Sequence, residues 1–274
     1  MIAADLGSAA ERRQMARALR RWIIEQSLAS NVGHVGSALG VVDIMAALWC
    51  GVMVDAGTAR PDRDRFILGK GHAALSLYAA LRWKRLLDEQ TYGTYCRDGS
   101  VLGVHPESVL PGVDVSTGSL GHGLSIGCGL ALAFLKKKKA ARVYALLSDA
   151  ECNEGQVWEA AMFAAHHRLA NLTVVVDLNG QQALGPTREI LERSAQAAIW
   201  SAFAWEALEV DGHDAESLVS ELLRPPSGER PRALVARTVL GKGVSFMEGR
   251  VEWHYRNLTA DLARQALAEV DAQP

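Results

Sequence analysis

Apolar residues recur at three-to-four spacing through the first part of the chain, which predicts helices joined by glycine-bearing loops. The predicted helices cover 12–30, 41–51 and 73–87, and the loops between them read SNVGHVGS and LGKGHAA. A further stretch, 92–119, is rich in glycine and proline. We expect that stretch to lie against another layer of the fold.

After residue 120, short apolar runs alternate with amphipathic segments. The runs predict strands over 142–147, 172–177, 207–210 and 233–239. The segments between and before them predict helices over 121–135, 155–169 and 214–223. This alternation indicates βαβ units, and hence an α/β fold whose parallel sheet carries helices on both faces. No linker divides the chain, so we expect residues 1–274 to form one domain.

Composition excludes several classes of protein. The 274 residues carry 29 basic and 31 acidic side chains, so no positive field recruits nucleic acid or an anionic membrane. The longest apolar run, 124–135, is shorter than the about 20 residues of a spanning helix, and the N-terminus has no apolar signal core. The four cysteines form no C-x-x-C pair, which argues against a zinc site and a disulfide framework. We expect a cytoplasmic protein.

Two oxygen-bearing side chains follow neighbouring predicted strands. Asp149 ends one strand, and Asn179 follows the next one after an intervening helix. A right-handed crossover places both at the carboxyl edge of the sheet, where open α/β sheets bind ligands. A carboxylate, an amide oxygen and a nearby carbonyl suit Mg²⁺ held together with phosphate oxygens. The alternative is structural: an Asp that caps the next helix and an Asn in a turn.

A glycine loop and three histidines add to this pattern. The segment STGSLGHGLS, 116–125, runs into a predicted helix, and free N–H groups at a helix start attract phosphate. His34, His72 and His105 each lie in a loop beside glycine or proline. A lone loop histidine is more often structural, but three that precede a phosphate-type loop indicate the polar wall of an active site.

In this order, these segments resemble the N-terminal, diphosphate-binding half of transketolase, most closely the form that is split between two polypeptides. The matching segments are SNVGHVGSALGVVDIMAALW, DRFILGKGHAALSLYAAL, HPESVLPGVDVSTGSLGHGLSIGCGLA, the Asp149–Asn179 unit, EVDGHD and TVLGKGVSFME. They extend from about residue 30 to residue 250. The resemblance implies the thiamine-diphosphate-binding fold of the PP type, with thiamine diphosphate and Mg²⁺ as cofactors and Ca²⁺ or Mn²⁺ as substitutes for the metal.

The resemblance also implies roles for single residues near the cofactor. Asp149 and Asn179 match the side-chain ligands of the magnesium ion, and Gln181 lies where a backbone carbonyl completes the protein's share. Glu154 matches an acid at the interface between subunits. The remaining positions matched to cofactor binding are His72, His105, Gly118, Ser119, Leu120 and Ala150.

Four histidines match the reacting centre of the family. His72 and His105 match residues that face the cofactor and the reacting carbons. His34 matches one that hydrogen-bonds the hydroxyls of the donor, and His254 matches a further active-site histidine. In the implied reaction the thiazolium ylide adds to a ketose carbonyl, a C–C bond breaks, and a two-carbon unit moves to an aldehyde. Neutral imidazoles suit proton transfer on such hydroxyls, while the cofactor holds the carbanion.

The chain departs from the family pattern at several places: Leu184 stands where the family commonly has Asp, His122 where it often has Gln, and two further departures lie close to the site. Ser148-Asp149-Ala150 stands where the family has Gly-Asp-Gly. If this position needs a positive φ, Ala150 is expected to cost about 1–2 kcal/mol of backbone strain. After His254 the chain reads Tyr-Arg-Asn-Leu instead of Gly-x-x-Pro, at the rim of the substrate channel. Both departures favour the hypothesis of a non-standard substrate.

The resemblance covers only half of an active site. Transketolases carry a second domain that binds the aminopyrimidine ring and supplies the glutamate that starts ylide formation, and about 25 residues after position 250 cannot form it. We therefore expect a separate C-terminal subunit with that pyrimidine-binding domain, a two-plus-two assembly, and no activity of this chain alone. The expected substrates are small sugars or sugar phosphates.

Two other functions stay open on the sequence. One is another thiamine-dependent condensation, like that of deoxyxylulose-phosphate synthase, with pyruvate as donor. The other is a degenerate, non-catalytic subunit, which the changes at Ser148 and Ala150 would explain. The three loop histidines and the segment EGQVWEAA favour the transketolase reaction.

Overall fold

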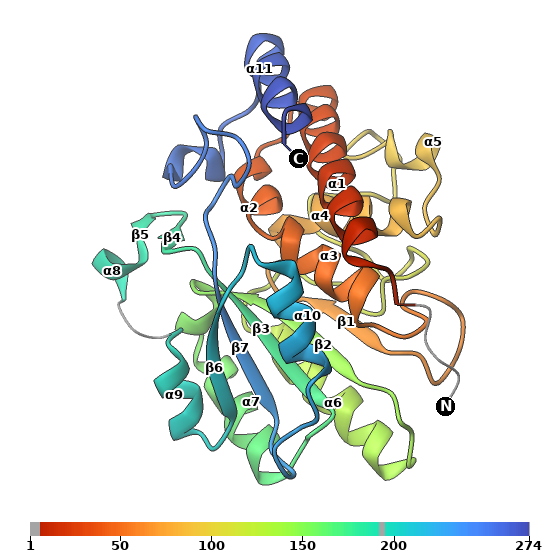
Figure 1. Ribbon diagram of the computed structural model, residues 1–274, viewed down its shortest axis with the longest axis vertical. Coiled ribbons are helices and arrows are strands. Elements are labelled where there is room, and N and C mark those ends of the chain that lie inside the picture. Colours follow the sequence, from red (N-terminus) through yellow and green to blue (C-terminus); the bar gives the residue numbers. More distant parts are fainter. Residues whose placement is uncertain (1–5, 192–194, 274) are drawn as a thin grey trace.

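A five-stranded parallel sheet forms the centre of the computed structural model, which describes residues 6–191 and 195–273 (Figure 1). The strand order is β1-β2-β3-β7-β6. The strands are β1 (Arg65–Leu68), β2 (Val143–Ser148), β3 (Leu172–Leu178), β6 (Glu206–Asp211) and β7 (Arg232–Arg237). Every neighbouring pair in this sheet is parallel, so all five carboxyl ends meet at one edge.

Helices cover both faces of the sheet, which confirms the predicted α/β class (Figure 1). One face carries the N-terminal helices and α10, and the other carries α6, α7 and α9. The helices of the first face are α1 (Ala9–Ser30), α2 (Val35–Gly40), α3 (Val42–Gly51), α4 (Ala74–Trp83) and α10 (Ala215–Leu223). Those of the second are α6 (His122–Lys136), α7 (Gly155–His166) and α9 (Ala197–Ala202). The last helix, α11 (Ala260–Asp271), packs on α1.

The short elements lie mostly near the carboxyl edge of the sheet. They are the single-turn helices η1 (Gly71–Ala73), η2 (Glu151–Asn153), η3 (Val251–His254), α5 (Glu89–Tyr92) and α8 (Thr187–Ile190), and the hairpin of β4 (Gln181–Gln182) with β5 (Gly185–Pro186). Helix α2 contacts both η1 and η3. Three loops far apart in sequence therefore meet beside the strand ends.

Alternation along the central strands explains the two-sided burial. In β3, Val175 packs with the core under the N-terminal helices, while Val174 and Val176 pack with the core under α6 and α7. All three side chains are fully buried. A strand that is buried on both faces reads as a continuous apolar run, which is the pattern that predicted this strand.

One prediction about the first part of the chain is wrong. Residues 65–68 form the edge strand β1, paired only with β2, where the pattern predicted helices and loops alone. The run Arg-Phe-Ile-Leu is too short to show a strand period, and it stands between a charged segment and a glycine. The four predicted strands after residue 120 are present, and their ends lie within two residues of the predicted ones.

None of the helices among the described residues is long and apolar enough to cross a membrane.

Candidate active site

Asp149, the first residue after β2, lies at the carboxyl edge of the sheet and is fully buried. Its carboxylate accepts hydrogen bonds from the N–H of Ala150 at 2.8 Å and the N–H of Gly180 at 3.0 Å. The hydroxyl of Thr187 donates to it at 2.8 Å. The bond from Gly180 places the Asp149 carboxylate directly beside the turn that follows β3.

That turn holds the second predicted oxygen donor. The side-chain oxygen of Asn179 accepts a hydrogen bond from the N–H of Gln181 at 2.9 Å, and its amide group donates to Asp177 at 2.9 Å. Both contacts fix the orientation of the Asn179 amide. Asp149 and Asn179 are thus brought together, as the strand-end argument predicted, and Gln181 lies beside them.

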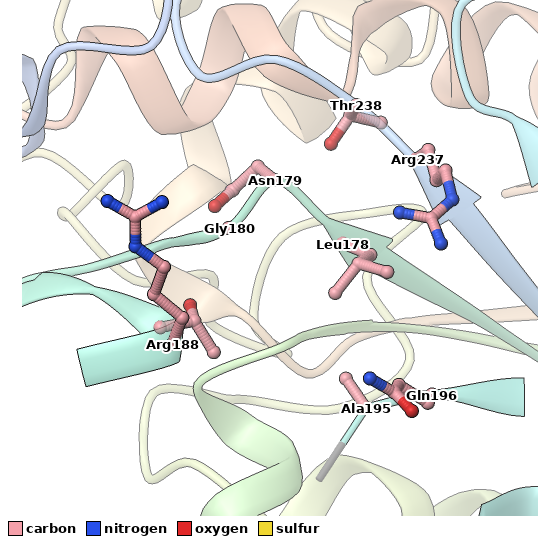
Figure 2. A pocket seen from close by; sticks show the side chains of 9 residues that line it. Leu178, Asn179, Gly180, Arg188, Ala195, Gln196, Arg237 and Thr238 are labelled. Atoms are coloured by element: carbon pink, nitrogen blue, oxygen red, sulfur yellow. The ribbon is translucent and has the colours of Figure 1, made fainter. Parts of the chain in front are cut away.

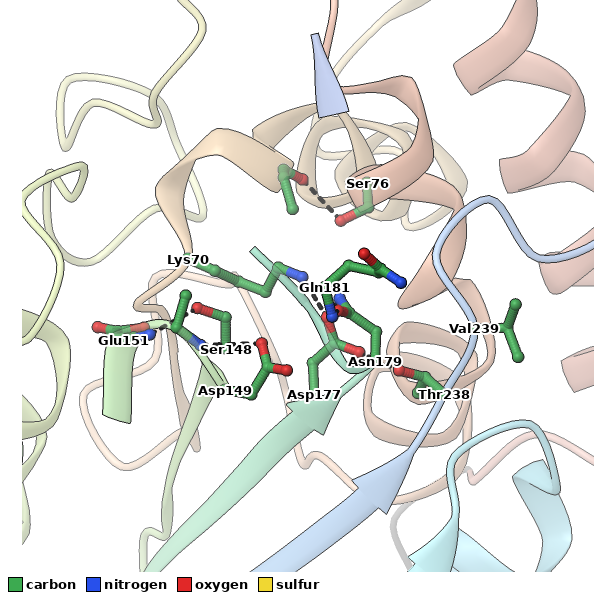
Figure 3. A network of polar contacts seen from close by, with 12 residues as sticks. Lys70, Ser76, Ser148, Asp149, Glu151, Asp177, Asn179, Gln181, Thr238 and Val239 are labelled. Carbon is green, nitrogen blue, oxygen red and sulfur yellow. Dashed lines mark hydrogen bonds and ion pairs between the residues drawn. The ribbon is translucent and has the colours of Figure 1, made fainter. Parts of the chain in front are cut away.

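A buried ion pair that the sequence analysis missed lies in the same network (Figure 3). The ammonium group of Lys70 pairs with Asp177, which also accepts a hydrogen bond from the hydroxyl of Thr238. Lys70 is only 1% exposed and Asp177 is fully buried. A signal was present, since Lys70 stands between two glycines directly after an apolar run, and a buried lysine requires a partner.

This network leaves Asp149 with an uncompensated charge. Lys70 pairs with Asp177, whereas the groups that contact Asp149 are neutral N–H and O–H donors. Burial, together with the nearby charge of Asp177, raises the pKa of Asp149 to about 6. A bound cation would stabilise the charged form, so the environment of this carboxylate fits a metal site.

The available oxygens suit a hard cation that brings ligands of its own. Over 6–191 and 195–273, no group of three or more His, Cys, Asp or Glu side chains is arranged to hold a metal. A cation bound to Asp149, Asn179 and the carbonyl of Gln181 would complete its shell with phosphate oxygens or water. Mg²⁺ is typically bound in this way.

Three of the predicted histidines form a compact cluster beside this network. The ring centroids of His34, His72 and His254 lie 5.2 to 5.4 Å apart. Nδ1 of His34 and Nδ1 of His254 are buried, and no described residue hydrogen-bonds to either atom. The cluster therefore presents unsatisfied polar atoms, which is typical of a site that receives a ligand.

The histidines of the cluster are neutral at neutral pH. Burial is the main cause: it lowers the pKa of His34, lowers that of His72 well below the ordinary value, and lowers that of His254 to about 4. The charge of Lys70 acts in the same direction on all three. Neutral imidazoles both accept and donate a proton, as acid–base work on hydroxyl groups requires.

The fourth histidine, His105, lies against the glycine loop. Gly118 has a φ of +152°, and a Cβ at this position would come within 3.1 Å of the His105 ring. A Cβ on Gly71 would lie 2.9 Å from the backbone of Gly118. The loop therefore passes closely between the segment of His72 and the ring of His105. Ser119 and Leu120 follow Gly118 and lead to the start of α6.

Glu154 is exposed at the start of α7, close to this loop. A Cβ on Gly121 would lie 2.8 Å from the Cβ of Glu154. A second acid, Glu151, was not predicted and is fully buried: it accepts a hydrogen bond from the N–H of Gly121 at 2.9 Å. Burial raises the pKa of Glu151 to about 7. Glu151 thus ties the start of α6 to the turn after β2.

One known protein family matches nearly the whole chain. Residues 11–273 match the family model described as the thiamine diphosphate binding domain of transketolase. The chain belongs to the transketolase family. This agrees with the resemblance that the loop motifs carried.

Relatives of two lengths share this family. The chain is 34% identical to an apulose-4-phosphate transketolase subunit of Phocaeicola vulgatus over 92% of this chain and 90% of that protein. It is 36% identical to a 6-deoxy-6-sulfo-D-fructose transketolase subunit of Clostridium sp. (strain MSTE9) over 94% and 95%. Human transketolase is 35% identical over 94% of this chain, which covers only 42% of the human protein.

Solved transketolases have the same fold. The transketolase of Campylobacter jejuni superposes with a TM-score of 0.88 at 25% identity, over 96% of this chain and 43% of that one. The present transketolase-family chain therefore spans less than half the length of the solved transketolases it matches. It spans nearly the whole length of the relatives that are named as subunits.

The backbone of Ala150 is not strained in this transketolase-family chain. The φ angle is negative, so the strain expected for a positive φ does not arise. Ala150 has φ −62° and ψ −38°, which is ordinary right-handed helical geometry. Ser148, the other departure from Gly-Asp-Gly, accepts a hydrogen bond through Oγ from the N–H of Glu151 at 3.0 Å. The two departures thus fit the turn that they form.

Ala150→Gly is therefore expected not to tighten cofactor binding. Glycine gains nothing at a helical φ, and its extra freedom in the unfolded chain lowers the free energy of unfolding by about 0.5–1 kcal/mol. Urea unfolding and calorimetric titration with thiamine diphosphate and Mg²⁺ measure the two quantities. Clearly tighter binding by the variant would contradict this account of the turn.

The lowered pKa of His254 predicts a pH effect on stability. Between about pH 6.5 and pH 4, the unfolded chain binds a proton at this residue and the folded chain does not, so acid destabilises the fold through His254. The raised pKa values of Asp149 and Glu151 act in the opposite sense. The comparison with His254→Asn isolates the histidine: the variant should lose less unfolding free energy from neutral to acidic pH than the parent chain. Equal losses would contradict the prediction.

A separate cavity of about 360 Å³ lies beside the turn after β3 (Figure 2). Asn179, Gly180 and Thr238 border it, and Arg188 and Arg237 lie on opposite sides of it. None of the four predicted histidines lines this cavity. The cavity therefore borders the turn after β3 and is not part of the histidine cluster.

Proposed function

We propose that this chain is the diphosphate-binding subunit of a split transketolase, which moves a two-carbon ketol unit from a ketose donor to an aldehyde acceptor. The observation that carries the proposal is the neutral histidine cluster beside the buried Asp149–Asn179 turn. Relatives named as transketolase subunits, similar over nearly their whole length, support it. The proposed substrates are small sugars or sugar phosphates, within cytoplasmic carbohydrate metabolism.

The proposed cofactors are thiamine diphosphate and Mg²⁺, for which Ca²⁺ or Mn²⁺ can substitute. Asp149, Asn179 and the carbonyl of Gln181 would hold the metal, and the loop from Gly118 to Leu120 with Ala150 would face the diphosphate. When bound, the cofactor supplies the carbon nucleophile and the electron sink for C–C bond cleavage. Within this arrangement, Lys70 neutralises Asp177 and leaves the charge of Asp149 for the metal.

The histidines would position the sugar and move its protons. The imidazoles of His34 and His254, whose Nδ1 atoms no described residue satisfies, would hydrogen-bond substrate hydroxyls. His72, with its strongly lowered pKa, would stay neutral and orient the reacting end of the substrate. His105, which is exposed above Gly118, would accept and return a proton at the hydroxyl next to the breaking bond.

The proposed partner is a separate C-terminal subunit that carries the pyrimidine-binding domain, in a two-plus-two assembly. Exposed apolar side chains on α7, Met162 and Phe163, support a docking face there. Glu154 lies at the start of the same helix, close to the glycine loop. A partner on this face would reach the cofactor site at the carboxyl edge of the sheet.

An assay of the reconstituted pair tests the proposal. A ketose donor labelled in its first two carbons should pass the label to an aldehyde product, with thiamine diphosphate and Mg²⁺ present. Release of labelled CO₂ from pyruvate would instead indicate a condensation like that of deoxyxylulose-phosphate synthase. A stable complex that binds no cofactor and transfers no label would indicate a non-catalytic subunit.

A further inference from the structure

An aromatic side chain, Tyr255, stands at the outer side of the histidine cluster. Its ring centroid lies 5.3 Å from that of His34 and 4.9 Å from that of His254. Tyr255 is 61% exposed, whereas His254 is 9% exposed and His34 is half-buried. The phenol ring is therefore the most solvent-exposed ring of this group.

The backbone that carries Tyr255 is firmly held. The N–H of His34 donates to the carbonyl of His254 at 3.1 Å, and the side-chain amide of Asn257 donates to the carbonyl of Asn31 at 2.9 Å. A Cβ on Gly33 would lie 2.5 Å from the carbonyl oxygen of Tyr255, so the two loops touch through their backbones. These contacts fix the backbone position from which the Tyr255 side chain projects.

The exposed part of the Tyr255 side chain makes few contacts with the rest of the described structure. No described residue hydrogen-bonds its hydroxyl, and its ring contacts among the described residues are the two histidines. An exposed aromatic ring next to hydroxyl-binding groups offers an apolar face for the C–H groups of a sugar and a polar edge for its oxygens. These properties suit the carbons of a sugar that lie beyond the reacting ones.

From this placement we infer that Tyr255 is a specificity-determining residue, which rests on the proposed transketolase function. Its ring contacts the distal carbons of an open-chain polyhydroxy aldehyde whose reacting end lies at the histidine cluster. The ring is uncharged, so it selects for the length of the carbon chain and not for a terminal phosphate. Acceptors too short to reach the ring gain nothing from it.

A series of acceptors of increasing length tests the inference on the reconstituted pair. Glycolaldehyde, glyceraldehyde and erythrose are assayed with one ketose donor, and the last two also as their phosphates. In Tyr255→Ala, kcat/KM for erythrose should fall about tenfold through KM, whereas kcat/KM for glycolaldehyde stays within twofold. Tyr255→Phe keeps the ring and should stay within threefold of the parent for every acceptor.

Matched controls separate specificity from folding. Glu252→Ala alters an exposed side chain on the same loop and should leave the whole series unchanged. The rise in melting temperature on adding thiamine diphosphate and Mg²⁺ should be the same in Tyr255→Ala and in the parent, which shows an intact site.

Three results would overturn the inference: an equal loss for all acceptor lengths, no loss for erythrose, or a loss confined to the phosphorylated acceptors. Each of these requires that the parent pair turns over its substrates. Absence of transfer by the parent pair with every acceptor would instead refute the proposed function.

Discussion

Asp149→Asn is expected to abolish the thermal stabilisation of the chain by thiamine diphosphate and Mg²⁺. The substitution keeps the shape of the side chain but removes the charge that a cation needs. Substitutions of residues that only orient the metal ligands already lower metal affinity by about 10–100-fold. For the loss of a ligand's charge at Asp149 we therefore expect metal affinity to fall by more than about 100-fold. Melting curves with and without both ligands measure it, and transfer by the reconstituted pair should be lost in parallel.

The same variant separates binding from folding. Without ligands, the removal of a buried charge offsets the loss of one hydrogen-bond acceptor at the N–H of Ala150, so the free energy of unfolding should change by no more than about 1–2 kcal/mol. Asp62→Asn, at an exposed surface aspartate, is the matched control and should keep the full stabilisation. A cofactor-induced rise in melting temperature that survives Asp149→Asn would refute the metal site.

His105→Ala is expected to reduce turnover by about 10²–10⁴-fold, the usual contribution of a positioned proton-transfer group. Cofactor binding should change little, because the His105 side chain is exposed and its ring makes no hydrogen bond to a described residue. Single-turnover kinetics of the reconstituted pair, beside a calorimetric titration of the cofactor, measure the two effects.

Arg264→Ala is the control for this prediction. Arg264 is an exposed side chain on α11, the helix that packs on α1, and its loss should leave turnover intact. If His105→Ala turned over at the parent rate, His105 would have no part in the reaction.

The parallel sheet was predictable because its central strands are buried on both faces. Runs such as 172–177 are long enough to show this, and the helices between them have clear amphipathic spacing. The edge strand β1 was missed because four residues with one pairing partner carry too little pattern. Because β1 was not predicted, the position of Lys70 just after the end of this strand could not be predicted either.

The candidate site was predictable where a residue's place in a strand fixed its position. Asp149 and Asn179 follow strand ends, so topology alone brought them together. The meeting of His34 and His254 could not be derived in that way, because it depends on backbone contacts between loops far apart in sequence. The resemblance to transketolase supplied that grouping, and the structure supplied its geometry.

The sequence did not allow us to predict which charged side chains of the site are buried. Nothing in the pattern distinguishes Glu151, which is fully buried, from Glu154, which is exposed three residues later. The pairing of Lys70 with Asp177 likewise depends on how two strand-end loops converge. Such electrostatic detail follows from tertiary packing, which local periodicity does not encode.

We propose that this chain supplies one half of an active site that a second protein chain completes. The rate of two-carbon transfer tests this at a fixed amount of this chain, with thiamine diphosphate and Mg²⁺, as the purified partner is added. We expect no transfer by the chain alone and a rate that rises to a plateau at one partner per chain. Full activity without the partner, or none at any ratio, would contradict it.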